Sequence, residues 1–131
     1  MSSTEKKKIL VIDDDFSMVA ALQVRLEANG YLVISAPDGE QGLQKAENEK
    51  PDLILLDVVM PNMDGYTFVK ELRRQPTASQ IPVIILSGRD KMKDLFELEG
   101  INDFLLKPYQ SESLLKKIKE LLQRVKEQLG K

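Results

Sequence analysis

The sequence ILVIDDD at residues 9–15 decides the fold of this chain, because a short apolar run ends abruptly in three acidic residues. Two later stretches repeat the arrangement: LILLD at residues 53–57, and DFLLKP at residues 103–108, where a lysine ends the run. Short apolar runs separated by helix-like segments are typical of central strands in a parallel sheet covered on both faces. In such sheets ligands bind beyond the carboxyl ends of the strands. We therefore expect the acids and the lysine to converge on one site.

The whole chain alternates strand and helix five times. The apolar pattern predicts strands at about residues 9–12, 32–35, 53–56, 83–86 and 104–106. It predicts helices at about residues 16–28, between residues 39 and 51, and at about 66–74, 91–99 and 112–128, the last capped by Ser111. Five such units indicate a doubly wound α/β fold, a five-stranded parallel sheet with helices on both faces. We expect one domain over residues 1–131, with residues 1–7 as a flexible tail and no output domain.

Composition excludes several classes of site. The 131 residues include 19 Lys and Arg against 21 Asp and Glu, a net charge of −2, so nothing favours binding to nucleic acid or a membrane. Cysteine and histidine are both absent, which excludes disulfides, thiolate chemistry, histidine acid-base catalysis and a phosphohistidine. The N-terminus lacks the apolar core of a signal peptide. We expect a soluble, cytoplasmic protein.

The acidic residues at the strand ends predict a metal site. Carboxylates held within a few ångströms repel one another unless a cation lies among them. Hard oxygen ligands favour Mg²⁺ or Ca²⁺ over softer metals. The alternative for any one acid is a solvated turn residue, and for Asp15 it is the N-cap of the following helix.

Several separated motifs, in order, carry a resemblance to a known family. They are VIDD at residues 11–14, LLDVVMPNMDG at 55–65, PVIILS at 82–87 and FLLKP at 104–108. With these motifs the chain resembles the receiver domain of a two-component response regulator, of the standalone, chemotaxis-type kind. The resemblance covers nearly all of residues 8–129. It implies the flavodoxin-like strand order 2-1-3-4-5.

The resemblance implies a role for each residue at the strand ends. Asp57 is the phosphoacceptor, which takes a phosphoryl group as an acyl phosphate. Mg²⁺ is held directly by Asp14, by Asp57 and by the backbone carbonyl of Val59, and through water by Asp13. Lys107 pairs with the phosphoryl group, although its ammonium could equally be a structural counter-ion of the resting site.

The resemblance also implies a switch and a control of dephosphorylation. Ser87 donates to a phosphoryl oxygen and couples to Phe104, although a serine at a strand end is often a turn former and a strand phenylalanine is by default core. Val59 and Arg89 flank the path of the hydrolytic water. Neither side chain is suited to orient that water, so we expect slow self-hydrolysis unless both simply point into solvent. The bond before Pro108 is implied to be cis.

The implied partners are a sensor histidine kinase or phosphotransfer protein and an unknown downstream protein. Residues 87–107 are slightly shorter than the family pattern, which puts the usual partner face in doubt. The apolar spacing of residues 115, 118, 122, 125 and 129 fits packing on the sheet, with phosphorylation-dependent dimerisation as the alternative to a monomer.

Two rival functions remain open from the residues. A phosphatase of the haloacid-dehalogenase type also uses an aspartyl phosphate, and Asp13 and Asp15 loosely fit its Asp-x-Asp signature. That reading leaves Asp57 unexplained. A degenerate receiver that serves only as an interaction module does not need the full set of acids, serine and lysine.

Overall fold

A computed structural model describes residues 6–57, 65–87, 103–107 and 109–129, without the side chains of residue 87 and residues 125–129. The strands in order are β1 (Lys8–Ile12), β2 (Leu32–Ala36), β3 (Leu53–Asp57), β4 (Val83–Ser87) and β5 (Phe104–Leu106). The helices of the described residues are α1 (Phe16–Ala28), α2 (Gly39–Glu49), α3 (Gly65–Arg73) and α5 (Ser111–Leu129). These bounds confirm every predicted strand and four predicted helices to within a few residues. The helix predicted at residues 91–99 lies outside the described residues.

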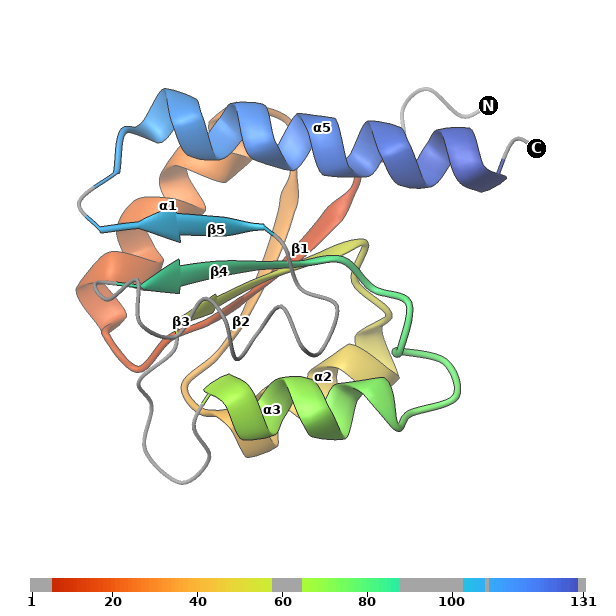
Figure 1. Cartoon of the computed structure of the whole chain (residues 1–131). Helices are drawn as coiled ribbons and strands as arrows, with labels where there is room; N and C mark the ends of the chain where they lie inside the picture. Colours follow the sequence, from red (N-terminus) through yellow and green to blue (C-terminus); the bar gives the residue numbers. More distant parts are fainter. Residues whose placement is uncertain (1–5, 58–64, 88–102, 108, 130–131) are drawn as a thin grey trace.

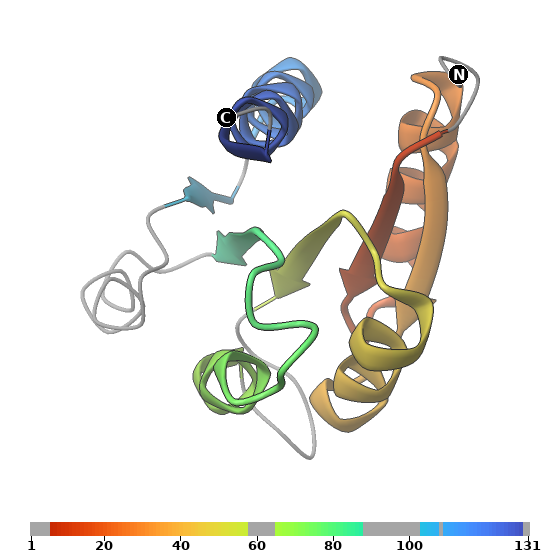
Figure 2. The ribbon, with the colours of Figure 1, turned by 90° about the vertical axis from the view of Figure 1, so that its right-hand side faces the viewer.

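The five strands form one parallel sheet in the order β2-β1-β3-β4-β5, as predicted. Figure 1 shows α1 and α5 on one side of the sheet and α2 and α3 on the other. The end-on view of Figure 2 shows the same layers with the twisted sheet between them. The strand order, the parallel pairing and the helices on both faces identify a doubly wound, flavodoxin-like α/β fold.

Each face of the sheet carries its own hydrophobic core, because side chains alternate along a strand. In β1, Leu10 and Ile12 pack toward α2 and α3, in a cluster that includes Phe68. Ile9 and Val11 pack on the opposite face, in the cluster that includes side chains of α1 and α5. The central strands are therefore apolar between their ends, since both of their faces are covered.

Polar residues fix the ends of the first two helices. Asp15 is the N-cap of α1, and Asp38 caps α2 by accepting a hydrogen bond from the Gln41 amide at 2.9 Å. Asn29 ends α1, and Gly30 follows in the left-handed region at a φ of +92°. Glycine adopts that conformation without steric cost. The helix predicted at about residues 16–28 therefore ends where the sequence indicated.

Three details differ from the sequence predictions. Ser111 is the first residue of α5 and not its cap, because the carbonyl of Gln110 already accepts from the amides of Ser113 and Leu114. The fully buried stripe of α5 comprises Leu114, Ile118 and Leu121, whereas residues 115 and 122 are only partly buried. Lys7, which was predicted to belong to a flexible tail, is held at its carbonyl by the Leu32 amide of β2 at 2.9 Å. Residues 1–5 lie outside the described residues.

Candidate functional site

Three carboxylates meet at the carboxyl end of the sheet. Asp13 follows the last residue of β1, and Asp57 is the last residue of β3, the adjacent strand. Each of Asp13, Asp14 and Asp57 offers one carboxylate oxygen, and these oxygens lie within 4.8 Å of one another. The parallel register explains the meeting, because strands that pair side by side end at the same edge.

Lys107 brings a positive charge to the same place from β5. Its Nζ donates to Oδ1 of Asp57 at 3.4 Å, across 50 residues of chain. The Asp57 side chain is 16% exposed and that of Lys107 is 30% exposed. Partial burial strengthens such a pair relative to one at the surface. Among the residues that the structure describes, the Lys107 ammonium is paired with this cluster of three carboxylates, which leaves an excess of negative charge there.

Asp13 is the most buried acid of the three, with 5% of its surface exposed. Its Oδ1 accepts a hydrogen bond from the Asp15 amide at 2.9 Å, and its own amide donates to the Ala36 carbonyl at 3.1 Å. Burial is the largest influence on this carboxyl and raises its pKa above the ordinary 3.8, and the charges of Asp57 and Asp14 raise it further. The Asp15 amide and the Lys107 ammonium oppose this increase. Asp13 is therefore held in a site that disfavours its charge.

Asp15 does not join the cluster. Its Oδ1 accepts from the amides of Ser17 at 3.0 Å and Met18 at 3.1 Å, two N–H groups in the first turn of α1 that have no partner within the helix. This confirms the prediction that Asp15 is a helix N-cap. The Asp-x-Asp signature of the phosphatase alternative consequently loses its second acid, which is engaged in capping.

The remaining predicted site residues are described only in part. Phe104 is half-buried and packs against the core on the α2 and α3 face. Ser87 ends β4, but its side chain lies outside the described residues, as do Val59, Arg89 and Pro108. Their assigned roles remain predictions from the sequence.

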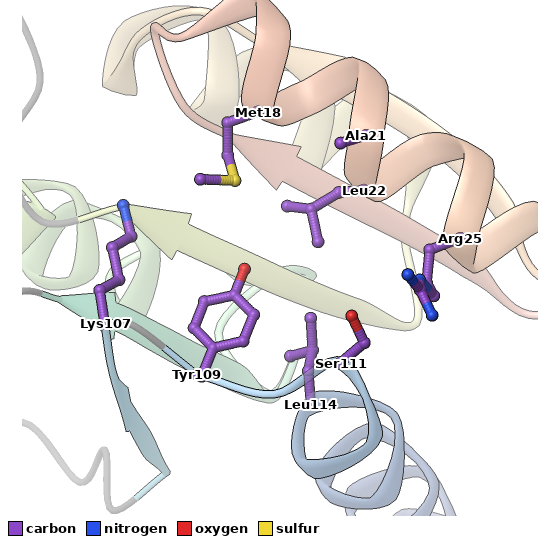
Figure 3. Close-up of a pocket in the computed structure, with 8 residues that line it drawn as sticks. All are labelled: Met18, Ala21, Leu22, Arg25, Lys107, Tyr109, Ser111 and Leu114. Carbon is purple, nitrogen blue, oxygen red and sulfur yellow. The ribbon is translucent and has the colours of Figure 1, made fainter.

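Tyr109 was not singled out by the sequence analysis. It follows the Lys107-Pro108 pair and lines a cavity between α1 and the start of α5, together with Lys107 (Figure 3). Burial raises the pKa of the Tyr109 phenol, and the nearby charge of Asp13 raises it further. The feature of the sequence that could have pointed to Tyr109 is its hydroxyl, because a phenylalanine would serve equally well if only an apolar side chain were needed here.

Comparison with known proteins identifies the family of the chain. Residues 9–119 match the family described as the response regulator receiver domain. The chain belongs to this family. It is therefore a receiver domain of the two-component type, a signalling domain, as the sequence motifs predicted. The match favours this family over the phosphatase alternative.

Individual relatives agree with this assignment of the receiver. Over 120 residues it is 45% identical to the alkaline phosphatase synthesis transcriptional regulatory protein PhoP of Bacillus subtilis, covering 90% of this chain and 49% of that protein. The receiver spans about half the length of the first curated relatives it matches.

Solved structures share the fold of the receiver closely. Chemotaxis protein CheY4 of Vibrio cholerae superposes with a TM-score of 0.83 at 33% identity, covering 88% of this chain and 98% of that one. The receiver domain of the sensor histidine kinase PA1611 from Pseudomonas aeruginosa superposes with a TM-score of 0.79 at 30% identity, covering 92% and 97%. That structure has a magnesium ion coordinated in its active-site cleft. In the described part of this receiver, no helix has both the length and the apolarity required to span a bilayer.

Proposed function

We propose that this receiver accepts a phosphoryl group on Asp57 from the phosphohistidine of a sensor kinase or phosphotransfer protein, or from a small phosphodonor. The observation that carries the proposal is the cluster of Asp13, Asp14 and Asp57, with Lys107 at 3.4 Å from Asp57. A cluster of acids without a cation is electrostatically unfavourable, so its presence favours a role in binding charge. The phosphorylated chain would then act on a downstream protein from the cytoplasm.

The chemistry is a phosphoryl transfer between two nucleophiles. A carboxylate oxygen of Asp57 attacks the phosphorus in line as the bond from phosphorus to the imidazole nitrogen of the donor breaks. The imidazole leaves with the electron pair of that bond, and the product is an acyl phosphate on Asp57. Lys107 already lies beside the attacking carboxylate. Its ammonium can follow the negative charge onto the phosphoryl oxygens, which adds electrostatic stabilisation to its resting role as counter-ion.

The donor set at the site fits a magnesium ion. Three carboxylates with oxygens within 4.8 Å of one another are hard ligands, and their mutual repulsion is relieved by a divalent cation. We assign direct contacts to Asp14 and Asp57 and to the carbonyl of Val59, and a contact through water to Asp13. When bound, the ion supplies positive charge that offsets the charge on the phosphoryl oxygens. The magnesium ion in the PA1611 receiver supports this assignment.

The proposal also includes a conformational switch and slow dephosphorylation. Ser87 would hold a phosphoryl oxygen, and Phe104 would change its packing in response. The half-buried state of Phe104 at the margin of the core supports a side chain with two possible positions. Val59 and Arg89 carry no carboxylate or amide to orient an attacking water, which supports slow loss of the acyl phosphate.

Intact mass spectrometry after incubation with acetyl phosphate and Mg²⁺ tests the proposal. The parent should gain the mass of one phosphoryl group, and Asp57→Asn should gain none while keeping the fold, since the change is nearly isosteric. The matched control is Asp15→Asn, because asparagine also caps helices well. It should label like the parent.

The alternatives give different results in the same experiment. Loss of labelling in Asp15→Asn with retention in Asp57→Asn would move the chemistry to the phosphatase-type motif. A parent that takes no label from acetyl phosphate would favour the degenerate receiver that only binds partners.

A further inference from the structure

A cavity of about 500 Å³ lies between α1 and the start of α5. Figure 3 shows its walls, which are mostly apolar and come from Met18, Ala21, Leu22, Leu114 and the ring of Tyr109. Small-molecule sites are typically apolar cavities of roughly 300–1,000 Å³ with a few polar groups that orient the ligand. The cavity matches that description in size and in the character of its walls.

The larger polar groups of this cavity, on Tyr109 and Arg25, have no protein partner among the described residues. The Tyr109 hydroxyl points from its ring toward Met18 and Leu22, and the Arg25 guanidinium lies at the end of the cavity near Ser111 (Figure 3). Neither group makes a hydrogen bond or ion pair with another described residue. Tyr109 is partly buried and Arg25 is exposed, so water satisfies these groups unless a ligand replaces it.

The charged side chains that line the cavity are positive, although the Asp13 carboxylate is near enough to raise the pKa of the Tyr109 phenol. Among the described residues, the lining contains Arg25 and Lys107 and no acidic residue. Lys107 is already paired with Asp57 at 3.4 Å, which leaves the guanidinium of Arg25 to meet an anion. Guanidinium groups bind carboxylates through two parallel hydrogen bonds, with better geometry than a lysine offers. The complementary ligand is therefore apolar along most of its length and anionic at one end.

We propose that this cavity binds a small apolar molecule with a single carboxylate. The apolar body lies between Leu22 of α1 and Leu114 of α5, and the carboxylate pairs with Arg25. The Tyr109 hydroxyl donates to any acceptor along the body of the ligand. An inorganic phosphate is a poorer occupant, because most of its surface would face apolar walls. A neutral hydrocarbon would gain nothing from the exposed guanidinium of Arg25, which would keep its water.

A two-dimensional amide and methyl NMR titration with octanoate, in parallel with 1-octanol, tests this site. The two probes share an apolar chain and differ in charge at the end group. Octanoate should shift the signals of Met18, Leu22 and Leu114 in a saturable way, and it should bind more tightly than octanol. The titration needs no phosphodonor, so its outcome is independent of the phosphoacceptor proposal.

Two substitutions sharpen the experiment. Arg25→Gln should weaken octanoate binding by roughly tenfold, the range expected for loss of a charge-assisted hydrogen bond, and leave octanol unchanged. The matched control is Arg74→Gln just after the end of α3, an exposed arginine paired with Glu71 and absent from the cavity lining. It should bind octanoate like the parent. Ala21→Trp should block both probes by filling the cavity.

Folding of these variants is checked by thermal unfolding. Arg25 and Ala21 are both exposed on α1, so neither substitution disturbs the buried core. If the tryptophan variant does not fold, the pair of arginine variants decides alone. Equal affinity of octanoate for both arginine variants, equal affinity of octanoate and octanol, or saturable shifts that lie elsewhere would overturn the proposal. So would the absence of any saturable shift, which would leave the cavity to a protein partner.

Discussion

Replacing Asp13 with asparagine should stabilise the protein in metal-free buffer. The substitution removes the most buried charge of the cluster, and asparagine keeps the oxygen that accepts from the Asp15 amide at 2.9 Å. The change therefore relieves repulsion without breaking the hydrogen bond that fixes the turn into α1. Most substitutions of buried residues destabilise a protein, so a gain in stability on replacing Asp13 would be an unusual result.

The spacing of the cluster sets the size of the effect. At the 4.8 Å limit between carboxylate oxygens, two unit charges repel by about 0.9 kcal/mol in bulk water and by about 3.5 kcal/mol at an effective dielectric constant of 20. The 5% exposure of Asp13 places the pair with Asp57 between these limits, and Lys107 offsets part of the repulsion. We expect a gain of about 1–2 kcal/mol in the free energy of unfolding, or about 4–7 °C in Tm for a domain of this size.

The gain should depend on pH in a definite direction. Burial and the charge of Asp57 raise the pKa of the folded-state Asp13 carboxyl above 3.8, so the folded protein takes up a proton more readily than the unfolded chain does. The destabilisation of the folded protein by the charged Asp13 carboxylate is absent below the unfolded-state pKa, where the acid is protonated in both states. It develops as the pH rises from there through the folded-state pKa and is complete above it. The advantage of Asp13→Asn should be full at neutral pH and should disappear as the pH falls toward 3.8.

Urea unfolding in the presence of EDTA measures the effect, with Asp15→Asn as the control for a generic change from acid to amide. Addition of Mg²⁺ should reduce or reverse the advantage, because a ligand that binds only the folded state stabilises the parent in proportion to its affinity. A variant that is no more stable than the parent at neutral pH without metal would refute the argument that repulsion dominates the cluster.

Three more substitutions test the conformational switch, the rate of dephosphorylation and the packing of the core. Ser87→Ala should still be phosphorylated but should lose much of the NMR shift change around Phe104 on addition of beryllofluoride and Mg²⁺; equal changes in parent and variant would remove the hydroxyl from the switch. Combining Val59→Asn with Arg89→Glu should speed decay of the acyl phosphate several-fold, and unchanged or slower decay would show that these side chains do not gate the water. Gly42→Val should cost about 1–3 kcal/mol by urea unfolding, because even a Cβ there would meet a core atom at 2.6 Å; an unchanged midpoint would mean that α2 shifts to make room.

The convergence of the acids and the lysine could be predicted from the sequence because they stand at the ends of paired strands. Asp13, Asp57 and Lys107 each follow or end an apolar run, and parallel pairing brings the ends of neighbouring strands to one edge. The N-cap role of Asp15 was also predictable, since it depends on local chain geometry alone. What could not be predicted is the burial of Asp13, which depends on packing by segments remote in the sequence.

The pattern in α5 was predicted less accurately, for a physical reason. Its apolar residues form a broad stripe, and sequence spacing alone does not say which edge of that stripe faces the sheet. Packing against the sheet selects Leu114, Ile118 and Leu121. The cavity beside Tyr109 was beyond prediction, because it depends on the separation of two helices that are far apart in the sequence.

The location of the phosphoryl group tests the central claim most directly. The parent protein is phosphorylated with acetyl phosphate and Mg²⁺, the acyl phosphate is trapped by reduction with borohydride, and the modified residue is mapped by peptide mass spectrometry. Our account predicts modification at Asp57, the residue that pairs with Lys107. Modification mainly at Asp13, with Asp57 unmodified, would contradict it.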